Sequence, residues 1–232
     1  MARKPGGEKP ELPPPDRSDR EKIIEVFMAL LAEHPFENIG FGEIAARSGL
    51  TLAQCRNEFP STASILAAHV KETDRKVLAG GAGDMAEEPP RERLFDVLMR
   101  RIEGLAPHRA AVRSLLRSAS TNPGLALLLN GLAVRSQQWM LTAADIDAAG
   151  PRGLIRAQGL ALLYARVMRV WINDDDPGLA RTLAALDREL ARGQRWAGFL
   201  DDLCRFAPAR CLRRGRRRRR HGDGTGEEPI MA

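Results

Sequence analysis

Apolar residues recur at helical spacing along most of the chain, and the first such run lies close to its start. The positions share one face of a helix: Ile23, Ile24, Phe27, Leu30 and Leu31. Ser18 followed by Glu21 has the spacing of a capping box, which marks the beginning of a helix. The residue before a proline avoids the helical region, so we expect this helix to end near His34-Pro35.

Two short helices separated by a tight turn are predicted next. Residues 42–48 form a brief helical pattern, and Gly49 interrupts it. Thr51 with Gln54 repeats the capping-box spacing, so a third helix should begin there and continue to about residue 59. A short helix, a glycine turn and a second short helix are the arrangement of a helix-turn-helix.

Helical patterns continue beyond residue 60. Ser61 can cap a fourth helix that runs to about Ala79, and later patterns span 91–105, 108–120, 123–144, 152–173 and 177–204. The pairs Asn-Pro at 122–123 and Asp-Pro at 176–177 each place a cap before a proline at the first helical position. No alternating strand pattern is present. We therefore predict an all-α fold, with an N-terminal three-helix helix-turn-helix domain and a C-terminal helical bundle.

Composition divides the chain into four segments. Residues 1–17 are rich in proline, glycine and charge, so we expect a disordered tail. The helix-turn-helix domain is placed at 18–80, and the helical second domain at 81–204 after a glycine-rich stretch. Residues 205–232 are expected to form a disordered, arginine-rich tail.

The net charge of +6 belongs to the C-terminal tail, where residues 205–232 hold nine arginines and three acidic residues. The segment 17–80 has eight basic and nine acidic residues, so it carries no excess positive charge for phosphates. No apolar run is long enough to cross a membrane, and no secretory signal is evident. Cys55, Cys204 and Cys211 are interpreted as free thiols, which favours a cytoplasmic location.

The helix-turn-helix region carries a resemblance in its motifs. The apolar first helix is followed by H-x-F-E-N-I, then E-I-A-x-R-S-G-L, and then F-P-S before the next helix. These motifs cover about 60 residues and resemble the N-terminal domain of the TetR family of transcriptional regulators. The resemblance implies a homodimer whose residues 47–62 face DNA. It also implies a second domain for ligand binding and dimerisation, and repression that the ligand relieves.

The resemblance assigns DNA binding to a set of residues around the third helix: Arg47, Thr51, Leu52, Gln54, Arg56, Asn57, Ser61 and Thr62. Basic side chains nearby form a local patch: Arg17, Arg20, Lys22, Arg47 and Arg56. The family usually has a lysine and a glycine where Leu52 and Ala53 stand, and a phosphate-contacting lysine at Thr62. Glu58 would place a carboxylate near phosphates. The alternative is a structural helical hairpin that no longer binds DNA.

The second domain carries a different resemblance. L-x-P-H-R-x-A-V-R lies near 105–113, V-W-x-x-D-D near 170–175 and A-x-L-D-R near 184–188. These pieces, spread over about 100 residues, are similar to a lipid-binding accessory family of ubiquinone biosynthesis that shares the TetR fold. This resemblance implies an isoprenoid-type lipid in the helical cavity, membrane docking through a C-terminal amphipathic helix, and no DNA binding.

Two sets of apolar residues are candidates for ligand or membrane contact. The first could line a pocket for an apolar small molecule or a lipid, or could simply be core or dimer interface: Trp139, Met140, Tyr164, Met168 and Trp171. The second shares a helix face before the arginine block: Trp196, Phe199, Leu200, Leu203 and Phe206. That stripe suits an anionic membrane surface or packing within a dimer. The arginines could instead contact nucleic-acid phosphates.

No catalytic constellation is evident. The four histidines fall in separate segments, and no nucleophile-elbow or phosphate-cradling glycine motif is present. The acidic run at 174–176 is interpreted as a loop and helix cap, so we expect no enzyme activity, no cofactor and no metal. The leading hypothesis is a cytoplasmic, homodimeric, TetR-like repressor that responds to an apolar small molecule. The alternative is a lipid-binding accessory protein of ubiquinone biosynthesis, peripheral at the inner membrane.

Overall fold

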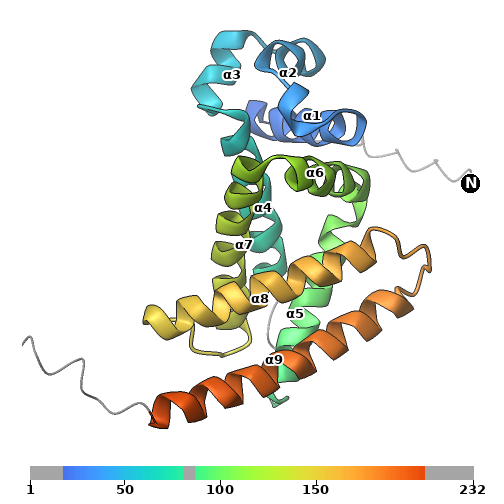
Figure 1. Ribbon diagram of the computed structural model, residues 1–232. Coiled ribbons are helices and arrows are strands. Elements are labelled where there is room, and N and C mark those ends of the chain that lie inside the picture. Colours follow the sequence, from blue (N-terminus) through green and yellow to red (C-terminus); the bar gives the residue numbers. More distant parts are fainter. Residues whose placement is uncertain (1–17, 81–86, 207–232) are drawn as a thin grey trace, which may run out of the picture. The chain divides into compact units, whose positions relative to one another are not determined.

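The computed structural model describes residues 18–80 and 87–206, with side chains up to Gln194 (Figure 1). The two predicted disordered tails, 1–17 and the chain after residue 206, lie outside the described residues. Every regular element in the described part is a helix, so the all-α prediction is confirmed. None of the described helices is both long and apolar enough to cross a membrane. The chain forms two compact units, and the boundary between them lies within the last helix, between Gly193 and Gln194.

The N-terminal helices follow the predicted pattern closely. They are α1 (Asp19–Glu33), the 3-10 turn η1 (Phe36–Asn38), α2 (Phe41–Ser48), α3 (Leu52–Glu58) and α4 (Thr62–Ala79). Capping boxes at Ser18 and Thr51 are confirmed, and Ser61 starts α4 with Ser64 as its reciprocal partner. Each box satisfies backbone groups that a helix end leaves without partners, which is why these helices begin where the sequence predicts.

The later helices also lie close to their predicted ranges. They are α5 (Pro90–Leu105), the 3-10 turn η3 (Ala106–His108), α6 (Arg109–Thr121), α7 (Pro123–Ala143), α8 (Gly150–Trp171) and α9 (Ala180–Phe206). The predicted cap at Asn122 is confirmed, because its side-chain oxygen accepts a hydrogen bond from the Leu125 amide at 3.0 Å. Pro123 then occupies the first helical position, where no amide hydrogen is needed.

The second predicted Asp-Pro start is wrong. α9 begins at Ala180, three residues after Pro177. The Asp176 carboxylate accepts hydrogen bonds from the amides of Gly178 and Ala180, at 3.2 and 3.0 Å, so it closes a turn ahead of the helix. Leu179 is left with φ 52°, a left-handed conformation that no helix continues through.

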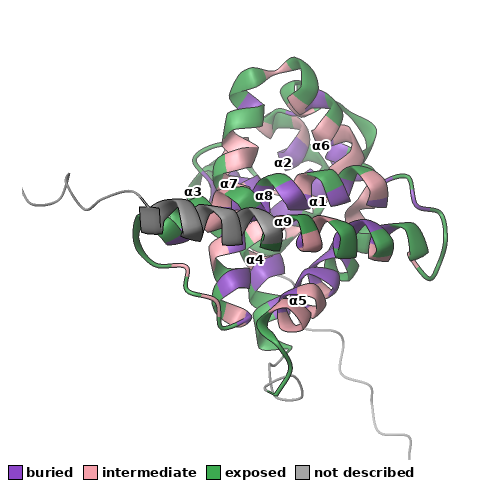
Figure 2. Cartoon of the chain, turned by 60° about the horizontal axis from the view of Figure 1, so that its bottom comes forward, coloured by how far each residue is buried: buried purple, intermediate pink, exposed green. Residues whose placement is uncertain are grey.

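Two apolar cores lie along the first unit. The first joins α1, α2, α3 and the beginning of α4, and residues of α6 and α7 complete it: Ala111, Leu115 and Leu125. The second is formed by the end of α4 together with α5, α7, α8 and the first part of α9. Figure 2 shows buried and exposed positions alternating along α8, as expected for a helix with one packed side. The domain division at residue 80 stays a prediction, since α4 serves both cores.

Candidate functional site

The turn between α2 and α3 depends on one glycine. Gly49 follows α2 with φ 70° and ψ 19°, and its amide bonds the carbonyl of Ala45. The Leu50 amide also bonds that carbonyl, at 3.2 Å. Glycine reaches this left-handed conformation without the steric penalty of a side chain. The turn therefore brings α3 back across α1, and Figure 1 shows α2 and α3 together at one end of the unit.

The orientation of α3 is set by two buried side chains. Cys55 and Phe59 are fully buried in the first core, so the opposite side of the short helix faces away from the protein. Leu52, Ala53 and Asn57 are exposed on α3, and Leu52 keeps 60% of its surface in solvent. The predicted DNA-facing residues of α3 are thus brought together on one exposed surface. Thr51 and Gln54 are also exposed, but they make hydrogen bonds within the protein as well.

Thr51 and Gln54 hold the start of α3. The Thr51 hydroxyl accepts from the Gln54 amide at 3.2 Å and donates to the Gln54 side-chain oxygen at 2.8 Å. The Gln54 side-chain nitrogen donates to the Asp19 carboxylate of α1 at 3.3 Å. These bonds fix α3 against α1, so both residues position the helix, whatever else they contact.

The basic patch predicted from the sequence is largely neutralised by acids. Arg47 makes two hydrogen bonds to the Glu33 carboxylate, at 2.6 and 2.9 Å. The hydrogen bond from Arg47 lowers the pKa of Glu33, and the same bond raises the pKa of Arg47. Lys22 lies 3.8 Å from the Asp19 carboxylate. Arg47 is exposed and Lys22 is half-buried, and each already has a counterion in the free protein.

The remaining cations of this surface are held by the far end of α3. Arg56 donates to the Pro60 carbonyl at 3.1 Å. Arg20 lies over the Phe59 ring, 4.4 Å from its centroid, and 3.8 Å from the Glu58 carboxylate. Glu58 therefore pairs with a cation and does not stand as an isolated carboxylate. Arg17, the remaining member of the predicted patch, lies outside the described residues.

Ser61 and Thr62 lie at the beginning of α4. Ser61 is exposed and caps the helix, accepting from the Ser64 amide at 3.2 Å. Thr62 is partly buried and is the first residue of the helix. Both stand at the edge of the exposed surface of α3, where a helix start offers backbone amide donors.

The five predicted pocket residues do not line one cavity. Met140, Tyr164, Met168 and Trp171 are buried in the second core, whereas Trp139 is 55% exposed. Adjacent residues on a helix project about 100° apart, so Trp139 and Met140 of α7 face different surroundings. The structure brings the other four together as packed core, the alternative that the sequence left open.

A buried polar network crosses this second core, and sequence reasoning missed it. Arg101 donates to Asp74 and to Ser136, both at 3.0 Å, and to the Tyr164 hydroxyl at 3.1 Å. Ser136 also donates to Asp74 at 2.7 Å. Burial raises the pKa of the Tyr164 hydroxyl. The network ties α4, α5, α7 and α8 together through one satisfied ion pair.

Among the described residues, the buried polar atoms without a hydrogen-bond partner include those of Gln137 and one of His69. Gln137 of α7 is fully buried, and neither atom of its side-chain amide has a hydrogen-bond partner within the described residues. His69 of α4 packs its ring edge-on against His108, with centroids 4.8 Å apart, and its Nε2 is also without a partner there. Burial, together with the charges of His108 and Arg101, lowers the pKa of His69 to about 4.

Two of the three motif segments of the second resemblance meet at the end of α8. Arg109 donates to the carbonyls of Trp171 and Asp174, and Arg113 donates to the Ile172 carbonyl. The Asp174 carboxylate accepts from the amide and hydroxyl of Thr182, at 2.8 and 2.6 Å, and these bonds lower its pKa. Cations at a helix C-terminus stabilise its unpaired carbonyls. These motif residues therefore have a structural role in joining α6, α8 and α9.

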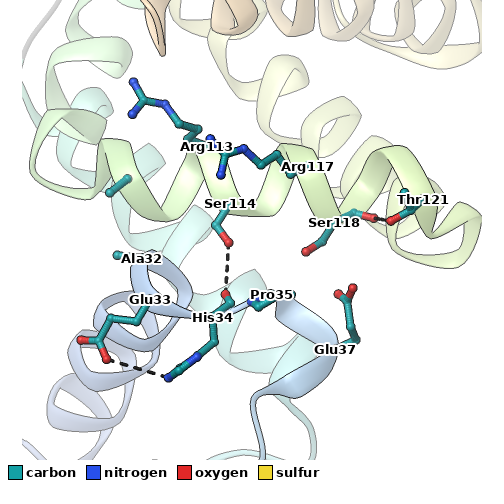
Figure 3. Close-up of a pocket in the computed structure, with 11 residues that line it drawn as sticks. Ala32, Glu33, His34, Pro35, Glu37, Arg113, Ser114, Arg117, Ser118 and Thr121 are labelled. Carbon is teal, nitrogen blue, oxygen red and sulfur yellow. Dashed lines mark hydrogen bonds and ion pairs between the residues drawn. The ribbon is translucent and has the colours of Figure 1, made fainter.

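A polar groove of about 430 Å³ lies where α1 and η1 meet α6 (Figure 3). Across it, Ser114 donates to the His34 carbonyl at 3.1 Å, and the Ser118 hydroxyl accepts from the Phe36 amide at 3.2 Å. In Figure 3 Arg113 points away from the groove, in keeping with its bond to α8. The groove thus marks the hydrogen-bonded junction between the N-terminal helices and α6.

The predicted membrane or interface stripe belongs to the last part of α9. The helix continues to Phe206, close to the predicted end. The side chains of the stripe lie outside the described ones: Trp196, Phe199, Leu200, Leu203 and Phe206. Among the described residues, no group of three or more histidine, cysteine or acidic side chains could hold a metal ion.

Solved structures with a similar fold include three transcriptional regulators. A TetR regulator from Nitrosomonas europaea ATCC 19718 has a TM-score of 0.59 and 21% identity, covering 75% of this chain and 97% of that one. One from Rhodococcus sp. RHA1 has a TM-score of 0.54 and 22% identity, covering 75% and 95%. A TetR-family regulator from Streptomyces coelicolor has a TM-score of 0.52 and 16% identity, covering 81% and 86%. No family model and no curated protein matches the chain.

Proposed function

We propose that this chain, which has the fold of TetR-type transcriptional regulators, is a homodimeric DNA-binding repressor that a small molecule releases. One observation carries the proposal. The buried side chains of Cys55 and Phe59 turn α3 so that Leu52, Ala53 and Asn57 face outward behind a glycine turn. A helix held in this way can enter a major groove, where its exposed side chains reach base edges. The three similar solved structures described above are transcriptional regulators, which supports the proposal.

The paired charges around α3 predict that contacts to DNA phosphates contribute little to the binding free energy, compared with contacts to bases. Arg47 and Arg20 are matched by Glu33 and Glu58 in the free protein. Phosphate neutralisation supplies most non-specific affinity for DNA. We therefore expect weak non-specific binding that depends little on salt, and a larger share of the affinity from contacts to bases.

Exposed apolar residues on α8 support the homodimer. Leu154, Ile155 and Leu162 each leave more than half of their surface in solvent. Ile155 and Leu162 are seven residues apart, so they lie on the same side of the helix. Because a twofold dimer presents the same patch from both copies, apolar residues on one helix can cover each other. Ile155→Glu combined with Leu162→Glu should therefore give monomers in light scattering.

The effector site is proposed for the second core. Met140, Tyr164, Met168 and Trp171 supply apolar surface there. Gln137, three residues before Met140 on α7, carries a buried amide whose hydrogen-bonding atoms have no partner among the described residues. A buried amide without a partner is costly, so a ligand that supplies one gains binding free energy. We therefore infer a largely apolar effector with at least one hydrogen-bonding group.

No contact among the described residues specifically supports the lipid-binding alternative. Two of the motif segments that suggested it hold the end of α8 through Arg109, Arg113 and Asp174. Hydrogen bonds of this kind stabilise the packing of the helices and do not distinguish a lipid-binding protein from any other protein of this fold.

DNase footprinting of the full-length dimer on the DNA upstream of its own gene, at low salt, tests the proposal. The wild-type protein should protect a discrete stretch, and Arg56→Ala with Asn57→Ala should weaken protection at least tenfold. Arg75→Ala, at an exposed position later on α4, removes the same charge and should leave protection intact. A folded dimer with no sequence-preferring binding at low salt would contradict the proposal.

A further inference from the structure

The outward surface of α3 carries two apolar residues, Leu52 and Ala53, beside the polar Gln54, Arg56 and Asn57. Leu52 and Ala53 open the helix and are exposed, although Cys55 and Phe59 already supply its packing into the core. A large side chain held in water at this place contributes nothing to the first core. Its exposure is explained if it becomes buried against a partner, because burial of apolar surface is favourable.

Asn57 adds one polar group to this surface. It is exposed, and its side-chain amide has no hydrogen-bond partner in the part of the chain that the structure describes. Asn57 stands four residues after Ala53, so these two lie one turn apart on the same side of α3, whereas Leu52 points roughly 140° around the helix from Asn57. The amide offers one donor and one acceptor side by side.

The other polar side chains of α3 are already engaged. Gln54 is bonded to Thr51 and Asp19, and Arg56 donates to the Pro60 carbonyl. Arginine bidentate to guanine is the commonest specific contact in a major groove. One N–H of Arg56 is already engaged within its own chain, so Asn57 is the better prepared of the two for contact with a base.

In a major groove, the C5-methyl group of thymine is an apolar feature, and adenine presents an N7 acceptor beside an N6 donor. Leucine and alanine match the methyl group, and asparagine matches adenine in a bidentate pair. On the basis of the function proposed above, we propose that α3 reads A·T base pairs. Leu52, at the start of α3, covers a thymine methyl group, and Asn57, one turn after Ala53, holds an adenine in another base pair of the same half-site.

Selection from a random duplex library with the full-length protein at low salt supplies the sequence to test. Each thymine of the selected half-site is then replaced in turn by deoxyuridine, which removes only the C5-methyl group. One replacement should weaken wild-type binding about fourfold, the equivalent of one buried methyl group. Leu52→Ala should bind that uridine duplex no more weakly than the thymine duplex. Leu127→Ala, an exposed leucine on α7, should keep the full wild-type sensitivity.

A second substitution probes Asn57. Replacing adenine by 7-deazaadenine removes the N7 acceptor and should weaken wild-type binding about tenfold, whereas Asn57→Ala should be insensitive to it. If the wild-type protein binds every uridine and 7-deazaadenine duplex as tightly as the unmodified one, or if its selected site depends on contacts to guanine, this inference is wrong, although the protein still binds DNA. Failure to enrich any sequence from a folded dimer overturns the proposed function and this inference together.

Discussion

The two cores of the first unit rest on different chemistry. The first is built from hydrocarbon side chains and the Cys55 thiol, and the buried hydroxyl of Ser118 lies at its edge on α6. Buried polar side chains accompany the second, namely a charged pair and an amide: Asp74 with Arg101, and Gln137. Apolar packing depends on volume, while buried polar groups also require particular partners in particular places.

This difference suggests separate roles for the two cores, one in positioning α3 and the other in responding to a ligand. The first core is a platform that holds α3 in one orientation through Cys55, Phe59 and local caps. The second core depends on bonds that span α4, α5, α7 and α8, so a ligand that changes one partner can change how these helices pack. The hydrogen bonds of Ser114 and Ser118 then connect α6 to the end of α1 and to η1.

The largest effect should come from breaking the buried ion pair. Arg101→Ala leaves the Asp74 carboxylate buried without its counterion, and we expect a loss of about 3–5 kcal/mol in the free energy of unfolding. Urea denaturation measures it. Arg47→Ala makes the same truncation in the exposed pair with Glu33, and it should leave the urea midpoint nearly unchanged. Equal losses from the two variants would remove the distinction between the regions.

A smaller effect should appear as a pH dependence that comes from the buried His69 of α4. The pKa of His69 is about 4 in the folded protein, below its ordinary value of 6.5, so the unfolded chain takes up the proton first. The stabilisation is therefore complete above pH 6.5 and is lost as the pH falls toward 4. It should amount to about 2 kcal/mol between pH 7.5 and 5.

Comparison with His69→Leu isolates that contribution. The charged groups around His69 include Arg101 and Lys76, with His108 at its ring, and all remain in the variant. Between pH 7.5 and pH 5 the unfolding free energy of the wild type should fall by about 2 kcal/mol more than that of His69→Leu. Parallel pH profiles for the two proteins would show that His69 is not the group responsible.

The turn before α3 should be sensitive to backbone strain alone. Gly49 has φ 70°, and a Cβ added there would meet nothing within 4 Å. Gly49→Ala should therefore cost about 1 kcal/mol for the left-handed conformation, with no contribution from a clash. Gly42→Ala is the matched control, since Gly42 lies within α2 with equally open space and should gain stability from helix propensity. Thermal denaturation distinguishes the two, and a loss in both would point to crowding.

The smallest effect should be a gain in stability. Gln137→Leu removes a buried amide without described partners, and the unfolding free energy should rise by about 1 kcal/mol. Gln158→Leu is the contrasting change, because Gln158 and Asn130 exchange hydrogen bonds at 3.0 and 2.9 Å. That variant should lose stability. Under the proposed function, Gln137→Leu should also weaken release of DNA by the effector, while its affinity for DNA stays unchanged.

Local signals explain which parts of the fold could be predicted. The caps at Ser18, Thr51 and Asn122 depend on residues at most three positions apart, so their effect is visible in the sequence. The Asp-Pro pair at 176–177 looks the same but closes a turn, because the Asp176 carboxylate reaches the amides of the next residues. A cap residue before proline can therefore either start a helix or close a turn ahead of one.

The buried network shows what local reading leaves out. Asp74 and Arg101 are 27 residues apart, and no sequence spacing connects them. One signal was present, since Arg101 falls on the face of α5 that buries Leu98 and Leu105. Trp139 and Met140 are adjacent on α7 and project in different directions, so only Met140 of the two lies with the other predicted pocket residues in the second core. The exposed surface of α3 was found because a helix-turn-helix is a local arrangement.

Amide hydrogen exchange of the full-length protein, with and without a duplex selected from a random library, tests the central claim most directly. Reading of DNA through α3 predicts increased protection within residues 47–62 on addition of the duplex. The exposed side of α7 around Leu127 should show no such change. Protection confined to α7 or α8, or unchanged exchange throughout 47–62 in a sample that binds the duplex, would contradict it.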